Sequence, residues 1–421
     1  MGKHLGFRFG GAVAVVTATA GLLATAAHAG SGRALASAGG HRQAVTQVRS
    51  DRNTAVFTAP VFVAAVARAM SEVAGSAVTA AMSPRQLAGQ RVIYSYSGLT
   101  PPASLLSLIR AGDVGGVIFF SDNYANAVQF KTAVHKLAAA NRAPTNPASA
   151  YPLLLMTDQE GGYIKRLPGA PNHSAKWIGT RDTAAGRGYQ ARQAGAGAAA
   201  TLLDFGLNVN LAPVIDVYRA PGDFDDRYQR SYSMNPQVVA NLGADFITAQ
   251  QGGGVAATAK HFPGLGAATA SQNTDDRDVT INLSKATLRR DDERPFQAAI
   301  AANVDLVMVS WAVYPHLGSA APAGMSPAIV QGELRGRLHF QGVTITDAIG
   351  ARALASYGSD QNRAMRAAQA GMQLILASDS GSQGTQCLDA LESGFQDGRL
   401  PAAAFRATVT QILMLRASVK P

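Results

Sequence analysis

Short apolar runs recur along the chain between about residues 90 and 377, and segments with helical spacing lie between most of them. The helical spacing is clear in Pro236–Gly252 and Ser284–Ala302. The runs are continuously apolar or β-branched rather than alternating, which is typical of strands covered on both faces. Eight such runs are present: Arg91–Ser95, Gly116–Phe120, Pro152–Thr157, Val209–Pro213, Ala256–His261, Leu306–Ser310, Val343–Asp347 and Leu374–Ala377.

Eight strands that alternate with helices predict an α/β fold, a (β/α)8 TIM-type barrel that forms one catalytic domain. An open doubly wound sheet is the alternative. No GxGxxG follows the first run and no GxxxxGK[ST] occurs anywhere in the sequence, so nucleotide-phosphate binding has no support.

The first residues have the three parts of a secretory signal peptide, which we place at residues 1–29. A basic start is followed by an alanine-rich apolar stretch from about residue 10 to residue 27, and then by Ala27-His28-Ala29 as a small-x-small cleavage site. The basic residues are Lys3, His4 and Arg8. We therefore expect a secreted protein that is cleaved near Ala29, with a membrane anchor as the alternative.

Residues 30–82 are expected to form a flexible and then helical N-terminal segment. They are rich in Gly, Ser, Ala and Arg up to about residue 55, and have helical character from Ala59 to Met82. Ser83 and Pro84 then have the residue types of a helix N-cap and first helical position. We place the barrel domain at residues 83–421.

The composition indicates a folded protein, because 47% of the 421 residues are hydrophobic and only 15% are charged. The net charge of +10 comes from scattered basic residues, so no nucleic-acid partner is predicted. Attraction to an acidic cell wall fits the charge equally well. The single cysteine, Cys387, cannot form an internal disulfide and no Cys/His cluster has zinc-ligand spacing, so we expect no metal.

Four of the runs turn from apolar to charged at the same end. The polar residues at these ends are Asp158 and Glu160 after the third run, Asp216 after the fourth, Lys260 and His261 in the fifth, and Asp347 in the seventh. The catalytic residues of barrel enzymes lie at the carboxyl ends of the strands. We therefore expect these side chains to share one face of the barrel.

The same segments resemble the barrel domain of glycoside hydrolase family 3. The matching stretches are GGVIFFSDN (115–123), LLLMTDQEGGYIKRL, LNVNLAPVIDV, RSYS (230–233), AKHFPGLG and GVTITDAI. The resemblance runs in order from about Ser83 to Ala377, and DQEGG with KHFPG is a specific combination. The chain has no room for the extra sheet domain of many β-glucosidases, so it is more similar to the compact bacterial β-N-acetylhexosaminidases.

The resemblance implies roles for particular residues. Asp347 matches the nucleophile that traps the sugar as a glycosyl ester, and Asp158 matches an acceptor for sugar hydroxyls. The cations and donors that match sugar-binding residues are Arg166, Arg230, Lys260 and His261. A structural ion-pair network is the alternative for these four. A helix cap is the alternative for Asp347, and a loop cap is the alternative for Asp158.

Other polar residues are expected to have supporting roles. Glu160 and Asp216 are expected to orient loops, and Trp311 could stack on a sugar or simply pack. His173 and His316 are isolated in the sequence and are expected to be surface or structural residues.

The sequence departs from the family pattern in the loop after KHFPG. Hexosaminidases of this type usually carry an Asp-x-His pair there, whose histidine is the general acid/base, but Ser271 and Asn273 occupy those positions. Our hypothesis is that Asp275 takes this role with a raised pKa; another source, such as Glu160, is the alternative. Tyr163 also replaces a residue that is often basic.

We therefore expect a monomeric, exo-acting retaining β-N-acetylglucosaminidase that acts on cell-wall or chitin-derived saccharides without a cofactor. A β-glucosidase or β-xylosidase with the same nucleophile is the second hypothesis. The third is a weakly active carbohydrate-binding or wall-associated protein that lacks the usual acid/base.

Overall fold

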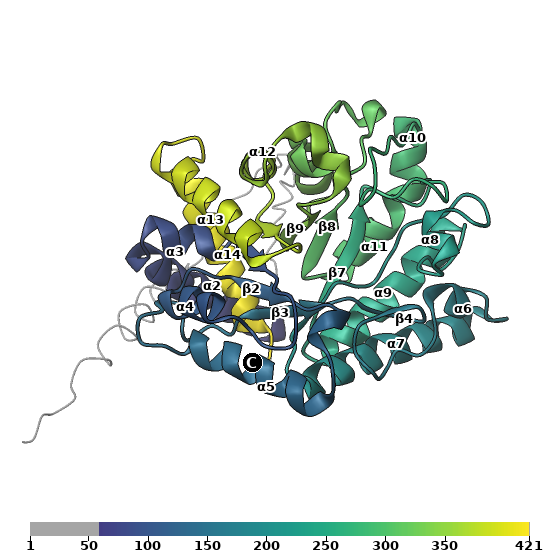
Figure 1. The fold of residues 1–421 in the computed structure, drawn as a ribbon. Coiled ribbons are helices and arrows are strands. Elements are labelled where there is room, and N and C mark those ends of the chain that lie inside the picture. Colours follow the sequence, from purple (N-terminus) through teal and green to yellow (C-terminus); the bar gives the residue numbers. More distant parts are fainter. Residues whose placement is uncertain (1–58, 421) are drawn as a thin grey trace, which may run out of the picture. The chain divides into compact units, whose positions relative to one another are not determined.

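Eight parallel strands form a closed barrel in the computed structural model, which describes residues 59–420 (Figure 1). The strands follow one another around the barrel in chain order, and the last pairs with the first. They are β1 (Val92–Tyr94), β2 (Gly116–Ile118), β3 (Leu154–Thr157), β6 (Val209–Asn210), β7 (Ala256–Phe262), β8 (Leu306–Val309), β9 (Val343–Ala348) and β10 (Leu374–Leu376). Each lies within or overlaps one of the eight apolar runs, so the barrel prediction is confirmed. The expected signal peptide lies outside the described residues.

In most of the strands, alternate side chains belong to two different apolar clusters. In β3, Leu154 and Met156 join the cluster that fills the barrel, whereas Leu155 joins the cluster between the strands and the helices. Both faces of each strand are therefore buried, which is why the runs have no polar alternation. A small antiparallel hairpin, β4 (Gln159–Gly161) and β5 (Ile164–Lys165), extends from the end of β3.

Helices surround the barrel on the outside (Figure 1). The longer ones are α2 (Ala59–Ala81), α4 (Ala103–Ala111), α5 (Ala127–Asn141), α7 (Ala184–Asp204), α9 (Pro236–Gly252), α11 (Arg294–Ala301), α12 (Asp360–Ala370), α13 (Gly381–Gln396) and α14 (Ala402–Ser418). The short ones are α3 (Pro84–Gly89), α6 (Ala175–Gly179), α8 (Phe224–Arg227) and α10 (Lys285–Thr287). None of the helices between residues 59 and 420 is long and apolar enough to cross a membrane.

Several tighter or wider helical segments complete the chain. The 3-10 segments are η1 (Ser121–Asn123), η3 (Pro315–Leu317), η4 (Ala323–Met325) and η6 (Arg352–Tyr357), and the π-helical ones are η2 (Leu288–Asp292) and η5 (Ala328–Arg337). The segment predicted as one helix at 284–302 is therefore divided into α10, η2 and α11.

The expected helix starts carry the expected caps. Ser83 Oγ accepts from the amide of Gln86 at 3.2 Å, and the Gln86 side chain accepts from the Ser83 amide at 3.0 Å, which forms a capping box ahead of Pro84. Glycine matters where α7 meets α9: a Cβ on Gly195 would lie 2.2 Å from the carbonyl oxygen of Phe246. Small residues thus allow these two helices to approach closely.

Helix α14 closes the amino-terminal end of the barrel. Its Ile412 and Leu415 belong to the cluster that fills the barrel. The fully buried guanidinium of Arg416 donates to the carbonyls of Pro152 and Tyr151, which precede β3, at 2.7 Å each. These bonds satisfy buried backbone carbonyls that have no water to bind.

We predict that Arg416→Met lowers the free energy of unfolding by about 2–4 kcal/mol, because it leaves buried carbonyls without donors. Urea unfolding at pH 7 measures the change. Arg399→Met is the matched control, since Arg399 forms an exposed ion pair with Asp397 and its loss should hardly change the free energy of unfolding. Equal losses for the two variants would contradict the assignment.

Candidate active site

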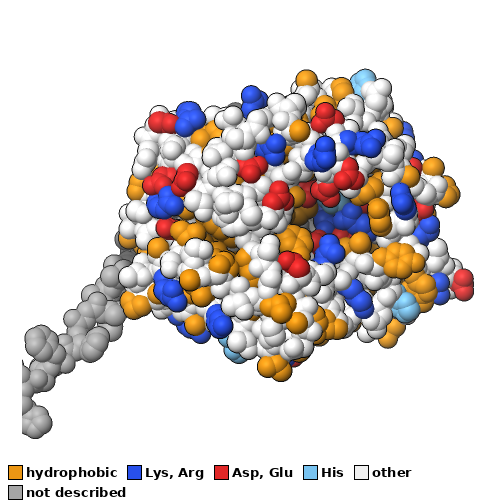
Figure 2. Space-filling model, viewed as in Figure 1, with side chains coloured by type: hydrophobic (Ala, Val, Ile, Leu, Met, Phe, Trp, Pro, Cys, Tyr) orange, Lys and Arg blue, Asp and Glu red, His pale blue; other side chains and the backbone are white. Residues whose placement is uncertain are grey.

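A cavity of ≈ 590 Å³ opens at the carboxyl ends of the barrel strands. Figure 2 shows it as a hollow with cationic and acidic side chains inside and apolar side chains around it. All seven residues expected in the site line it: Asp158, Arg166, Arg230, Lys260, His261, Asp275 and Asp347. Side chains from five different strand ends or loops are thus brought together as predicted, and what each does stays a proposal.

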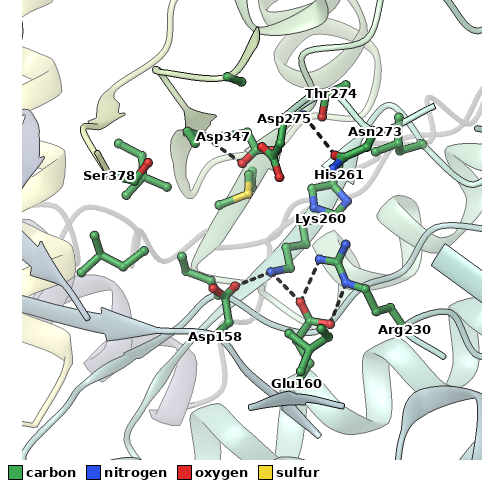
Figure 3. Close-up of a pocket in the computed structure, with 18 of the residues that line it drawn as sticks. Asp158, Glu160, Arg230, Lys260, His261, Asn273, Thr274, Asp275, Asp347 and Ser378 are labelled. Atoms are coloured by element: carbon green, nitrogen blue, oxygen red, sulfur yellow. Dashed lines mark hydrogen bonds and ion pairs between the residues drawn. The ribbon is translucent and has the colours of Figure 1, made fainter. Parts of the chain in front are cut away.

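A network of two cations and two carboxylates forms the floor of the cavity (Figure 3). Lys260 Nζ lies 2.7 Å from Asp158 Oδ1 and 2.8 Å from Glu160 Oε1. The Arg230 guanidinium binds Glu160 through two parallel bonds of 2.9 Å each. Arg166 approaches Asp158 more loosely, at 3.8 Å. Glu160 therefore holds both main cations, which is more than the loop orientation expected for it.

The charges of this network control each other's protonation. Burial by itself raises the pKa of Glu160, but the charges of Arg230 and Lys260 outweigh it and hold that pKa at about 2. Burial lowers the pKa of Lys260, and the charges of Asp158 and Glu160 more than reverse this, so that it lies above its ordinary value. Both groups are therefore charged at neutral pH.

His261 is oriented by Asp216 from the neighbouring strand end. Its Nδ1 lies 2.8 Å from Asp216 Oδ2, while the other Asp216 oxygen accepts from the amide of Leu265 at 2.6 Å. Burial lowers the pKa of His261, and the charge of Asp216 raises it above its ordinary value. Asp216 is fully buried, so it positions the histidine and the following turn, as expected.

Asp225, which the sequence analysis did not single out, completes this buried group. Its Oδ1 lies 3.3 Å from Arg230 Nη1. Burial is the main cause that raises the pKa of Asp225 to about 7, and the charge of Asp216 is the second. Ligand atoms of Asp216, Asp225 and His261 lie within 4.8 Å of one another, the one such three-residue group between residues 59 and 420. Hydrogen bonds already occupy both Asp216 oxygens, so we assign no ion to this group.

Asp347 and Asp275 lie next to each other above this floor (Figure 3). Asp347 is the penultimate residue of β9 and accepts a 2.7 Å bond from the amide of Ala348. Asp275 is an exposed loop residue, but its carboxyl group faces the cavity. There, partial burial and then the charge of Asp347 raise its pKa to about 6. The raised pKa of Asp275 allows this carboxyl group to hold a proton at mildly acidic pH.

The loop that carries Asp275 is attached to the segment after β9. The carbonyls of Thr274 and Asp275 accept from the amides of Ala353 and Arg352 at 3.0 and 3.1 Å. Asn273, at the position expected for the family histidine, also lines the cavity. Its Oδ1 accepts from the Asp275 amide at 3.0 Å, so its side chain helps to shape the loop.

Three other expectations can be compared with the structure. Trp311 is fully buried and its Nε1 donates to the Ala348 carbonyl at 2.8 Å, so it packs behind the site. His173 stacks on Trp177 and His316 contacts Asn282, both away from the cavity lining. Ser378 and Asp379 line the cavity directly after β10. Their place after the eighth apolar run was the signal that could have identified them.

A closed parallel barrel with carboxylates and cations gathered at the carboxyl ends of its strands is typical of a barrel enzyme. A model of the glycosyl hydrolase family 3 N-terminal domain matches residues 86–415. The chain therefore belongs to glycosyl hydrolase family 3 and is a glycosidase, as the sequence motifs indicated.

Individual relatives agree with this family. The chain is 43% identical over 331 residues to an uncharacterized secreted glycosyl hydrolase of Arthroderma benhamiae, with 78% of this chain and 92% of that one aligned. A family 3 β-N-acetylglucosaminidase of Paenibacillus sp. matches at 31% identity and a TM-score of 0.73, over 80% of this chain and 63% of that one. A β-N-acetylhexosaminidase of Beutenbergia cavernae matches at 30% identity and a TM-score of 0.70, over 80% of this chain and 99% of that one.

We predict that Glu160→Gln lowers the free energy of unfolding at pH 7 by about 3 kcal/mol, because two buried cations lose their shared carboxylate. The folded pKa of Glu160 lies below its ordinary value, so its stabilisation is present above that value and is lost as pH falls toward about 2. The difference between variant and wild type should therefore shrink between pH 5 and pH 2. Urea unfolding across this range, with the exposed Glu72→Gln as control, measures it. A difference that does not change with pH would contradict the ionised network.

Proposed function

We propose that the protein is a secreted, exo-acting retaining β-N-acetylglucosaminidase, with Asp347 as nucleophile and Asp275 as acid/base. The observation that carries the proposal is the adjacency of these two carboxyl groups in one cavity, where the Asp347 charge contributes to the raised pKa of Asp275. The activities in the names of the Paenibacillus and Beutenbergia proteins support the N-acetyl sugar. The name of the Arthroderma relative and the basic, alanine-rich N-terminus support secretion.

The reaction follows in two steps from the positions of the two groups. An ionised Asp347 oxygen attacks the anomeric carbon, while protonated Asp275 transfers its proton to the glycosidic oxygen as that bond breaks. The sugar is then held as an ester on Asp347. Ionised Asp275 takes a proton from water, and the water oxygen attacks the same carbon and releases Asp347.

The floor network holds the sugar during both steps. The carboxylate of Asp158 is held 2.7 Å from Lys260, and its oxygens accept hydrogen bonds from sugar hydroxyls. Lys260 and His261 donate to the hydroxyl oxygens. Neither step requires a cofactor, because the two carboxyl groups supply both the covalent bond and the proton.

The substrate class is tested with aryl glycosides that carry N-acetylglucosamine, glucose or xylose. We expect the wild type to prefer the N-acetylglucosaminide and Asp347→Ala to lose at least about a thousandfold in kcat on it. Circular dichroism and urea unfolding check that the variant is folded. A preference for the glucoside or xyloside would change the substrate but keep the nucleophile. Saccharide binding without turnover of any member would contradict the proposed enzyme.

The acid role of Asp275 predicts a dependence on the leaving group. Asp275→Asn should keep most of its activity on an activated aryl glycoside, which needs little protonation, but should lose about a hundredfold on N,N′-diacetylchitobiose. Because Asp275 must be protonated and its pKa is about 6, wild-type kcat/KM on the disaccharide should fall above that pH. The variant should lack this fall. Asp182→Asn, at an exposed position outside the cavity lining, is the control, and wild-type rates of Asp275→Asn on both substrates would exclude Asp275.

A further inference from the structure

Two exposed tyrosines stand beside the mouth of the cavity and have no part in the reaction described above. Tyr228 lines the cavity and is 39% exposed, and Tyr163 is 69% exposed. An exposed aromatic ring leaves apolar surface in contact with water unless a ligand covers it. The chemistry proposed at the floor of the cavity requires neither tyrosine.

Tyr228 is held at the rim by the turn that also sends Arg230 to the floor. The chain leaves α8, and its amides at Gln229 and Arg230 bond back to the carbonyls of Asp226 and Asp225 at 2.9 and 2.8 Å. Gln229 has a φ of 58°, an uncommon conformation for a residue with a side chain. Tyr228 packs edge-on against Phe224, with centroids 5.5 Å apart and planes at 73°. Its position is thus set before any ligand binds.

Tyr163 reaches the same rim from the β4–β5 hairpin. Gly161 and Gly162, at φ 109° and 58°, make the tight turn that presents it, and its neighbour Ile164 lines the cavity. Gln229 links the two tyrosines: its Nε2 donates to Tyr163 Oη at 3.4 Å, a long bond, and its Oε1 accepts from Ser174 Oγ at 2.9 Å. Two chain segments are therefore joined where the tyrosines emerge.

The direction in which the leaving group extends follows from the apolar residues that close the inner end of the cavity. Ile118, Leu211, Met308 and Leu376 line its depth and belong to the cluster that fills the barrel. A sugar bound over them has no room to extend inward. Its leaving group must therefore extend toward the open side of the cavity, where the exposed Tyr228 is one of the lining residues.

We propose that Tyr228 and Tyr163 form a binding platform for the leaving saccharide, with Tyr228 under its first sugar and Tyr163 under its second. A pyranose ring has an apolar face of C–H groups and a polar edge, which suits the ring and hydroxyl of tyrosine. Tyrosine also loses little conformational entropy on binding, having two rotatable side-chain bonds. This inference rests on the proposed glycosidase function of the same cavity.

The test compares substrates with and without a leaving sugar. Tyr228→Ala should lower kcat/KM on N,N′-diacetylchitobiose roughly three- to tenfold more than on N-acetyl-β-glucosaminyl fluoride, whose leaving group is a single ion. Tyr228→Phe keeps the ring and should restore most of the difference. Tyr163→Ala should affect triacetylchitotriose more than the disaccharide. The control Tyr189→Ala, a 55% exposed tyrosine on α7, should change none of these ratios.

The outcomes separate the two proposals. If the wild type hydrolyses neither the fluoride nor the disaccharide, the proposed function fails. If the wild type hydrolyses both, and Tyr228→Ala lowers both equally or changes neither, the function stands and the platform is overturned. An unchanged ratio of trisaccharide to disaccharide rates in Tyr163→Ala removes Tyr163 from the platform.

Discussion

The shared binding of Lys260 and Arg230 by Glu160 is the constraint on which the rest of the site depends. Three segments meet there: the end of β7, the hairpin after β3 and the turn after α8. Buried cations without a counter-charge would be strongly unfavourable, so these segments are stable only when they meet. The same contact fixes Lys260 beside Asp158 and Arg230 beside Asp225. Barrel closure brings the strand ends near one another, and this carboxylate determines how they meet.

The network also produces an uneven charge distribution inside one cavity. Lys260, Arg230 and Arg166 surround Asp158 and Glu160 at the floor, whereas Asp347 and Asp275 face each other above it (Figure 3). Cations favour ionised carboxylates, and neighbouring carboxylates oppose each other's ionisation. The floor therefore stays charged and suits hydroxyl binding, while Asp275 retains a proton at mildly acidic pH. The two parts of one cavity therefore differ in their electrostatic surroundings.

Much of this arrangement could be predicted because two signals coincide in the sequence. Doubly buried strands produce continuous apolar runs, and parallel strands in a barrel all end on one face, so Asp158, His261 and Asp347 could be placed together without coordinates. Asp225 could not, because it lies in a short helix whose approach to Arg230 depends on the turn at Gln229. Nor could the division of 284–302 into α10, η2 and α11, since a π-helical segment of five residues is too short to change the apolar pattern of the whole stretch. The position of Tyr228 at the cavity could not be predicted either, because a single tyrosine beside a charged turn belongs to no repeating pattern of apolar residues.

The absence of the family Asp-x-His pair has a structural counterpart in how this loop is held. A proton donor must stay close to the nucleophile, and here the backbone provides that: Thr274 and Asp275 accept hydrogen bonds from Ala353 and Arg352, shortly after Asp347 in the chain. The loop after β7 and the loop after β9 are thus one unit, with Asn273 bracing the turn at the position of the usual histidine. These bonds tie the backbone at Asp275 to the segment that follows Asp347. In the proposed mechanism this attachment keeps the carboxyl groups of Asp275 and Asp347 near each other without an Asp-x-His pair.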